Sequence, residues 1–89
     1  MYNSYKIQII MKNAVIDWYL EEMGIEKTID DINIVWYSGY DLRQQAILKA
    51  DDNLLFECVY VENKLRIQIY ESTYYKEIDS RRFNSNVEF

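Results

Sequence analysis

The residues in this chain that are best able to carry out chemistry are one cysteine and three pairs of adjacent carboxylates. Cys58 is the only cysteine, and the sequence contains no histidine that could act as its base. A nucleophilic thiol needs such a base or a cationic neighbour, so Cys58 is expected to be a small buried apolar residue. The pairs Glu21-Glu22, Asp30-Asp31 and Asp51-Asp52 lie beside expected turns or at a helix end, where adjacent acids are usually solvated.

The motifs of most enzymes and cofactor sites are missing. No Asp-x-Asp-x-Asp-Gly loop or comparable spacing supports a divalent-cation site. With Gly24 and Gly39 as the only glycines, no glycine-rich phosphate loop can form. A small metal-free endoribonuclease could use Glu57 with Arg66 on one sheet face, but it would also be expected to carry a basic RNA-binding surface. We therefore expect no enzymatic activity, no metal and no cofactor.

Length and charge limit the class of protein further. A chain of 89 residues forms one small domain. Its 15 acidic and 10 basic residues give a formal charge of -5, which disfavours direct binding to nucleic acid phosphates. The single thiol, the polar N-terminal segment and the lack of a long apolar run predict a cytoplasmic protein without a membrane span.

The apolar pattern predicts a helix followed by strands. From 4 to 23, apolar residues recur at three- and four-residue steps, and Gly24 is placed to end that helix. Strands are expected over 32–37, 44–50, 54–61 and 65–70. Gly39 is expected to take a positive φ in a turn after the first strand. A hairpin turn around Asn63 would place Phe56, Cys58 and Tyr60 on the same face as Leu65, Ile67 and Ile69.

These elements predict an α+β fold in which one N-terminal helix packs on a four-stranded antiparallel β-meander. Residues 1–79 would form the single domain and 80–89 a flexible C-terminal tail. Within the domain, 72–79 are compatible with a fifth short strand or a helical turn.

The acidic excess is local. Residues 1–16 carry a charge of +2, residues 17–41 carry -6 and residues 42–89 carry -1. If the helix end, the connector and the first strand loop lie together, they form an acidic edge that complements a basic partner. The alternative is that these acids are merely solvated. The expected contact residues are Glu21, Glu22, Glu26, Asp30, Asp31 and Asp41, with Trp36, Tyr37 and Tyr40 as aromatic anchors.

The order of apolar and aromatic positions is similar to that of a known group of proteins. The stretches 34–37, 45–48, 55–60 and 65–70 resemble a family of short, uncharacterised proteins encoded by phages and prophages of low-GC Gram-positive bacteria. The resemblance covers about residues 11–77 and includes no catalytic signature. It implies a phage origin and a location in the host bacterial cytoplasm.

Two functional hypotheses follow. The first is a phage-derived, non-enzymatic inhibitor of a basic host nucleic-acid-binding defence protein, with no direct contact to nucleic acid. An anti-CRISPR protein that blocks an effector nuclease through an acidic, DNA-mimicking edge is one example. The alternative is a structural or regulatory protein-interaction module with no defence role. Such a module could form a homodimer through the broad apolar helix surface or through an exposed sheet edge.

Overall fold

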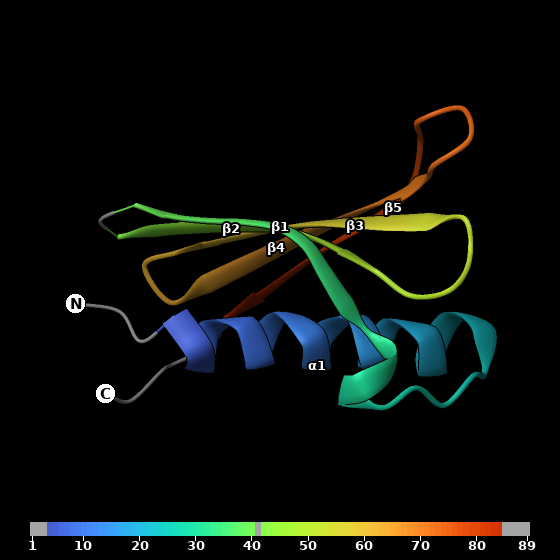
Figure 1. Cartoon of the computed structure of the whole chain (residues 1–89), viewed down its shortest axis with the longest axis horizontal. Coiled ribbons are helices and arrows are strands. Elements are labelled where there is room, and N and C mark those ends of the chain that lie inside the picture. Colours follow the sequence, from blue (N-terminus) through green and yellow to red (C-terminus); the bar gives the residue numbers. More distant parts are fainter. Residues whose placement is uncertain (1–3, 41, 85–89) are drawn as a thin grey trace.

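The computed structural model describes residues 4–40 and 42–84, which form one long helix and an antiparallel sheet. The helix covers one face of the sheet, and each strand pairs with the next along the chain (Figure 1). The predicted α+β class is confirmed, but the sheet has five strands instead of four. The elements are α1 (Ser4–Met23), the short 3-10 helix η1 (Ile29–Asp31), β1 (Asn33–Tyr40), β2 (Arg43–Lys49), β3 (Leu54–Val61), β4 (Lys64–Glu71) and β5 (Lys76–Asn84).

The helix has the predicted bounds and the predicted buried stripe. Its end is set by Gly24, which has a φ of 64°. The amides of Gly24 and Ile25 then donate to the carbonyls of Leu20 and Tyr19, which satisfies acceptors that a helix end otherwise leaves free. The side chains that α1 buries against the sheet are Ile7, Met11, Ala14, Val15, Trp18 and Tyr19.

The hairpin of β3 and β4 is also as predicted. Glu62 and Asn63 form a two-residue turn with φ values of 51° and 63°, the conformation that matches the twist of paired strands. Cys58 pairs with Ile67 across the two strands. The six residues assigned to the inner face are all buried, so the predicted register is confirmed.

The prediction for Gly39 is wrong. β1 continues through 38–40, so Gly39 lies inside a strand, and it is not among the glycines with a positive φ. Position 39 requires glycine because there is no room for a side chain. A Cβ atom there would lie 2.5 Å from Oε1 of Gln44 and 3.1 Å from the hydroxyl oxygen of Tyr37. Glycine at this position therefore permits a close approach between β1 and β2.

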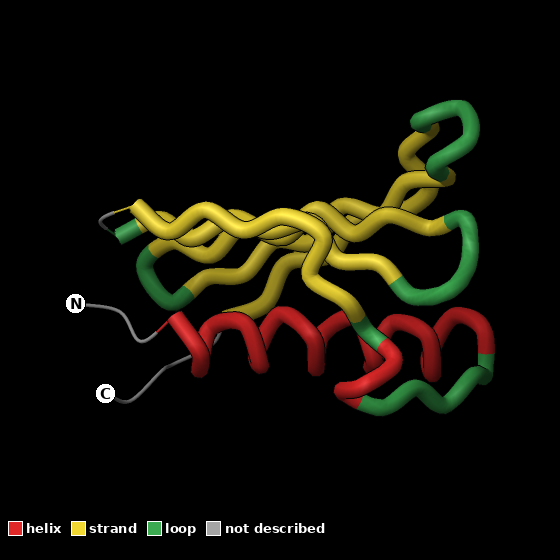
Figure 2. The backbone as a smooth tube through the Cα atoms, in the orientation of Figure 1, coloured by secondary structure: helices red, strands yellow, loops and turns green. Residues whose placement is uncertain are grey.

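The fifth strand corrects the predicted tail, because 80–84 belong to β5. This strand has no alternating apolar pattern, since two of its helix-facing residues are charged. Asp79 accepts a hydrogen bond from Nε1 of Trp18 at 2.7 Å, and Arg81 forms ion pairs with α1. These bonds to α1 hold β5 against the helix together with Phe83, which packs against the core. The strand twists toward the helix along its length (Figure 2). Residues 85–89 of the predicted tail lie outside the described residues.

We expect the hydrogen bond from Trp18 to Asp79 to stabilise the fold measurably. Replacing Asp79 with Ala leaves a buried indole N–H without its acceptor and should lower the free energy of unfolding by about 1–3 kcal/mol. Asp79→Asn keeps an acceptor oxygen and should cost less. Urea unfolding at pH 7 measures both changes.

The pH dependence tests the same contact. The bond from Trp18 holds the pKa of Asp79 below its ordinary value of 3.8. The stability gained from this carboxylate is therefore complete above that pH and is lost as the pH falls through the lower folded-state pKa. The difference in unfolding free energy between wild type and Asp79→Asn should shrink between pH 7 and pH 3. A constant difference would contradict this role.

Candidate functional site

Carboxylates from three segments gather at one end of the molecule. The connector that follows α1 (24–28), η1 and the turn between β2 and β3 lie on this side of the molecule (Figure 1). Two contacts join them: Nζ of Lys27 lies 3.2 Å from Oδ1 of Asp51, and the hydroxyl of Tyr19 donates to Asp52 at 2.7 Å. We call this surface the acidic end and define it by the following residues: Glu26, Asp30, Asp31, Asp51 and Asp52.

Two of the acids predicted as contacts have a structural role. Glu21 and Glu22 both form ion pairs with Arg81 of β5, so α1 and the edge strand are joined at this point. Part of their charge is neutralised within the chain. The acidic end therefore consists mainly of the connector and of Asp51 and Asp52, which the sequence prediction did not include as contacts.

The remaining acids of the connector and of η1 are exposed. Asp31 accepts hydrogen bonds from the backbone amide and hydroxyl of Thr28 at 2.7 and 3.0 Å, and the backbone bond above all lowers the pKa of Asp31. The hydrogen bond from Lys27 lowers the pKa of Asp51. Glu26 and Asp30 are exposed and form no ion pair with any other described residue.

The predicted aromatic anchors do not share one face. A bulge in β1 between Ile34 and Trp36 shifts the alternation, so that Trp36 points to the helix-free face and Tyr37 packs against the core. Trp36 is 48% exposed, whereas the hydroxyl of Tyr37 is buried. The side chain of Tyr40 and the whole of Asp41 lie outside the described residues.

Apolar side chains are exposed beside the acidic end. Met23 is the last residue of α1 and Ile25 lies two residues beyond it, and both are exposed. Val35 is exposed at the bulge of β1, four residues after the end of η1. Apolar groups surrounded by charges are typical of protein interfaces, in which the apolar groups supply most of the affinity and the charges supply orientation.

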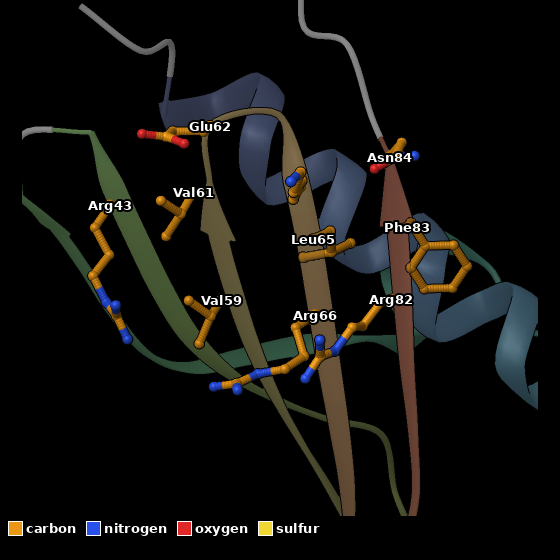
Figure 3. Close-up of a pocket in the computed structure, with 10 residues that line it drawn as sticks. Arg43, Val59, Val61, Glu62, Leu65, Arg66, Arg82, Phe83 and Asn84 are labelled. Carbon is orange, nitrogen blue, oxygen red and sulfur yellow. The ribbon is translucent and has the colours of Figure 1, made fainter.

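A second charged surface was missed by the sequence prediction. The face of the sheet that α1 leaves uncovered carries a groove of about 600 Å³ over β2 to β5. Three of its basic side chains, Arg43, Arg66 and Arg82, are labelled in Figure 3, and the fourth is Lys64. We call it the basic groove. Strand alternation did predict that Arg66 points outward, but Arg82 was assigned to the tail, so the cluster could not be assembled from the sequence.

Glu57 and Arg66, the pair that a small endoribonuclease could use, both lie on the helix-free face, as the pairing of β3 with β4 requires. Glu57 accepts a hydrogen bond from the hydroxyl of Tyr75 at 2.5 Å, and the Tyr75 ring stacks on Tyr70 at 4.8 Å. The bond to Glu57 raises the pKa of Tyr75. Within 4–40 and 42–84, no three acidic or cysteine residues are grouped so as to hold a metal ion.

No protein-family model, curated protein or solved structure matches this chain. Among the described residues, no helix is long and apolar enough to cross a membrane. The functional interpretation therefore depends on the two charged surfaces and on the chemistry of their residues.

Cys58 should be unreactive in the folded protein. Its side chain is buried in the core, and this burial raises the pKa of the thiol to about 12. Since the thiolate is the reactive form, labelling by an aromatic disulfide reagent at pH 8 should be slow and should accelerate with urea. Rapid labelling in native buffer would show that Cys58 is accessible.

Proposed function

We propose that this chain is a phage-derived, non-enzymatic inhibitor whose acidic end binds a basic surface of a bacterial nucleic-acid-binding defence protein, for example an effector nuclease. The observation that carries the proposal is the convergence of carboxylates from the 24–28 connector, η1 and the β2–β3 turn. On such a surface, carboxylates would occupy positions that phosphates of the nucleic acid otherwise take.

The acidic end keeps a net negative charge despite its internal contacts. Lys27 offsets one carboxylate, and Nζ of Lys49 donates to the backbone carbonyl of Asp52. The exposed carboxylates of Glu26 and Asp30 have no such partner among the residues described. Because unscreened surface charges steer association, they favour fast, salt-dependent binding to a basic protein.

The neighbouring apolar residues supply binding affinity that exposed charges alone do not provide. Exposed charges contribute little affinity individually, whereas buried apolar anchors contribute most of it. Met23, Ile25 and Val35 are available for this purpose. A partner that covers both groups would bury apolar area and pair its own Lys and Arg residues with the acidic end.

The chemistry of the other polar groups is consistent with a binding role. Cys58 is buried with a thiol that stays protonated near neutral pH. Glu57 is engaged by the hydroxyl of Tyr75. Neither group needs to change its protonation or bonding state for the acidic end to bind a partner.

The test is a comparison of two baits with equal charge. The variant Glu26→Gln/Asp30→Asn removes two acids that form no hydrogen bond or ion pair with another described residue, and Asp17→Asn/Glu62→Gln removes two acids elsewhere. Affinity capture from a bacterial lysate with mass spectrometry should recover a basic nucleic-acid enzyme with wild type and with the Asp17/Glu62 variant. Recovery should fall at least fivefold with the Glu26/Asp30 variant.

The captured enzyme then allows a direct test of inhibition. Purified wild-type protein should displace DNA from it, with an inhibition constant that rises with salt. Equal binding by both variants would reject the electrostatic mechanism. Recovery of this chain alone, with self-association in light scattering, would instead favour the alternative of a homodimeric interaction module.

A further inference from the structure

The basic groove brings together cations that are far apart in the sequence. Arg43 comes from β2, Lys64 and Arg66 from β4, and Arg82 from β5, and all of them project from the helix-free face (Figure 3). They form no ion pair with another residue in the described part of the chain. Among the described residues that line the groove, Glu62 at the β3–β4 turn is the one acid.

Two of these cations face each other directly. Arg66 and Arg82 occupy opposite register positions on β4 and β5. Like charges at such positions repel one another, and an anion bound between them would remove the repulsion. The planar guanidinium group also matches the geometry of phosphate, to which it can donate two parallel hydrogen bonds.

The size of the groove matches a chain of anions better than a single one. Since neighbouring strands lie about 4.8 Å apart, β2 with Arg43 and β5 with Arg82 are separated by about 14 Å across the sheet. Val59 and Val61 form an apolar floor between them. Such a site can accommodate several phosphates, with sugars or bases against the floor.

An exposed aromatic ring lies on the same face. Trp36 pairs with Ile47 of β2 and projects to the helix-free side, 48% exposed. Ile47 follows Arg43 by about four residues along β2, so the ring lies about 13 Å from Arg43 in the strand direction. A basic groove accompanied by an exposed aromatic ring is the usual design of surfaces that bind single-stranded nucleic acid.

We infer that the helix-free face of the sheet binds single-stranded nucleic acid, with phosphates at Arg43, Lys64, Arg66 and Arg82 and a base stacked on Trp36. This site is separate from the acidic end and does not depend on the function proposed for it. The overall charge of -5 does not exclude it, because five of the 15 acids lie at the acidic end and two more, Glu21 and Glu22, are paired with Arg81.

An acidic peptide fits the groove less well. Extended peptides usually bind a sheet by adding a strand to its edge through backbone hydrogen bonds. The floor of this groove is made by β3 and β4, which are both paired on either side. Binding there must use side chains alone, which suits a ligand with many phosphates and with bases that can stack.

Fluorescence anisotropy with fluorescein-labelled dT15 and rU15 tests the inference. Both probes should bind at 20 mM salt, and the tighter one identifies the preferred nucleic acid. The variant Arg66→Gln/Arg82→Gln should weaken binding at least tenfold. It should also reduce the slope of log affinity against log salt by about 1.4, that is about 0.7 for each phosphate that the variant no longer neutralises. Trp36→Ala should weaken binding at least fivefold.

The matched control is Lys12→Gln/Lys76→Gln, which has the same net charge but leaves the basic groove intact. It should bind within twofold of wild type, as should Glu26→Gln/Asp30→Asn at the acidic end. Thermal unfolding of each variant confirms that the fold is retained, and Arg66→Lys separates the loss of charge from the loss of guanidinium geometry.

Three results would overturn the inference. One is equal weakening by the groove variant and the Lys12/Lys76 control. Another is competition by polyglutamate as effective as that of unlabelled dT15. The third is an absence of probe binding while sedimentation shows low-salt self-association that the groove variant abolishes, because the groove would then bind the acidic end of a second copy.

Discussion

The packing of two adjacent aromatic residues of α1 on the centre of the sheet determines the arrangement of the rest of the molecule. Trp18 and Tyr19 contact Phe56 of β3, with ring centroids 5.3 and 5.4 Å apart. Each also donates a hydrogen bond beyond the core, to Asp79 of β5 and to Asp52 of the β2–β3 turn. Burial and directional bonds therefore position the helix together, on one face only.

That one-sided packing separates the charges of the chain. The C-terminal end of α1 carries the connector and η1 to the β2–β3 turn, where the acidic end forms. The opposite face of the sheet has no helix over it, and the outward residues of β2, β4 and β5 form the basic groove. The net charge of -5 for the whole chain therefore describes neither the acidic end nor the basic groove.

The parts of the fold that could be predicted are those in which one chemical preference dominates. The helix and the β3–β4 hairpin follow from apolar periodicity and from an asparagine suited to a left-handed turn. A fifth strand was one of two interpretations left open for 72–79, but the extent of β5 could not be predicted. The contacts of Asp79 and Arg81 with α1 replace the apolar alternation that marks a strand. The role of Gly39 depends on the side chains of Gln44 and Tyr37, which only the register brings to it.

The candidate sites, too, were predictable only where one continuous segment of the sequence carries them. The acidic connector is continuous in the sequence and was recognised, but its joining to Asp51 and Asp52 requires the turn between β2 and β3 to meet the end of α1. Strand alternation alone places the adjacent Trp36 and Tyr37 on opposite faces. Which of the two reaches the helix-free face depends on a bulge that has no clear sequence signal. The basic groove needs four strands in register, so it emerges only from the pairing of β2 through β5.

The bulge of β1 also affects how this sheet can meet another chain. β1 and β5 are the two edges of the sheet, and a regular edge strand is an open template for aggregation through backbone pairing. The extra residue at Val35 interrupts that template on β1 and twists it locally. The irregularity that moves Trp36 to the open face thus also protects the chain from uncontrolled growth of the sheet at this edge.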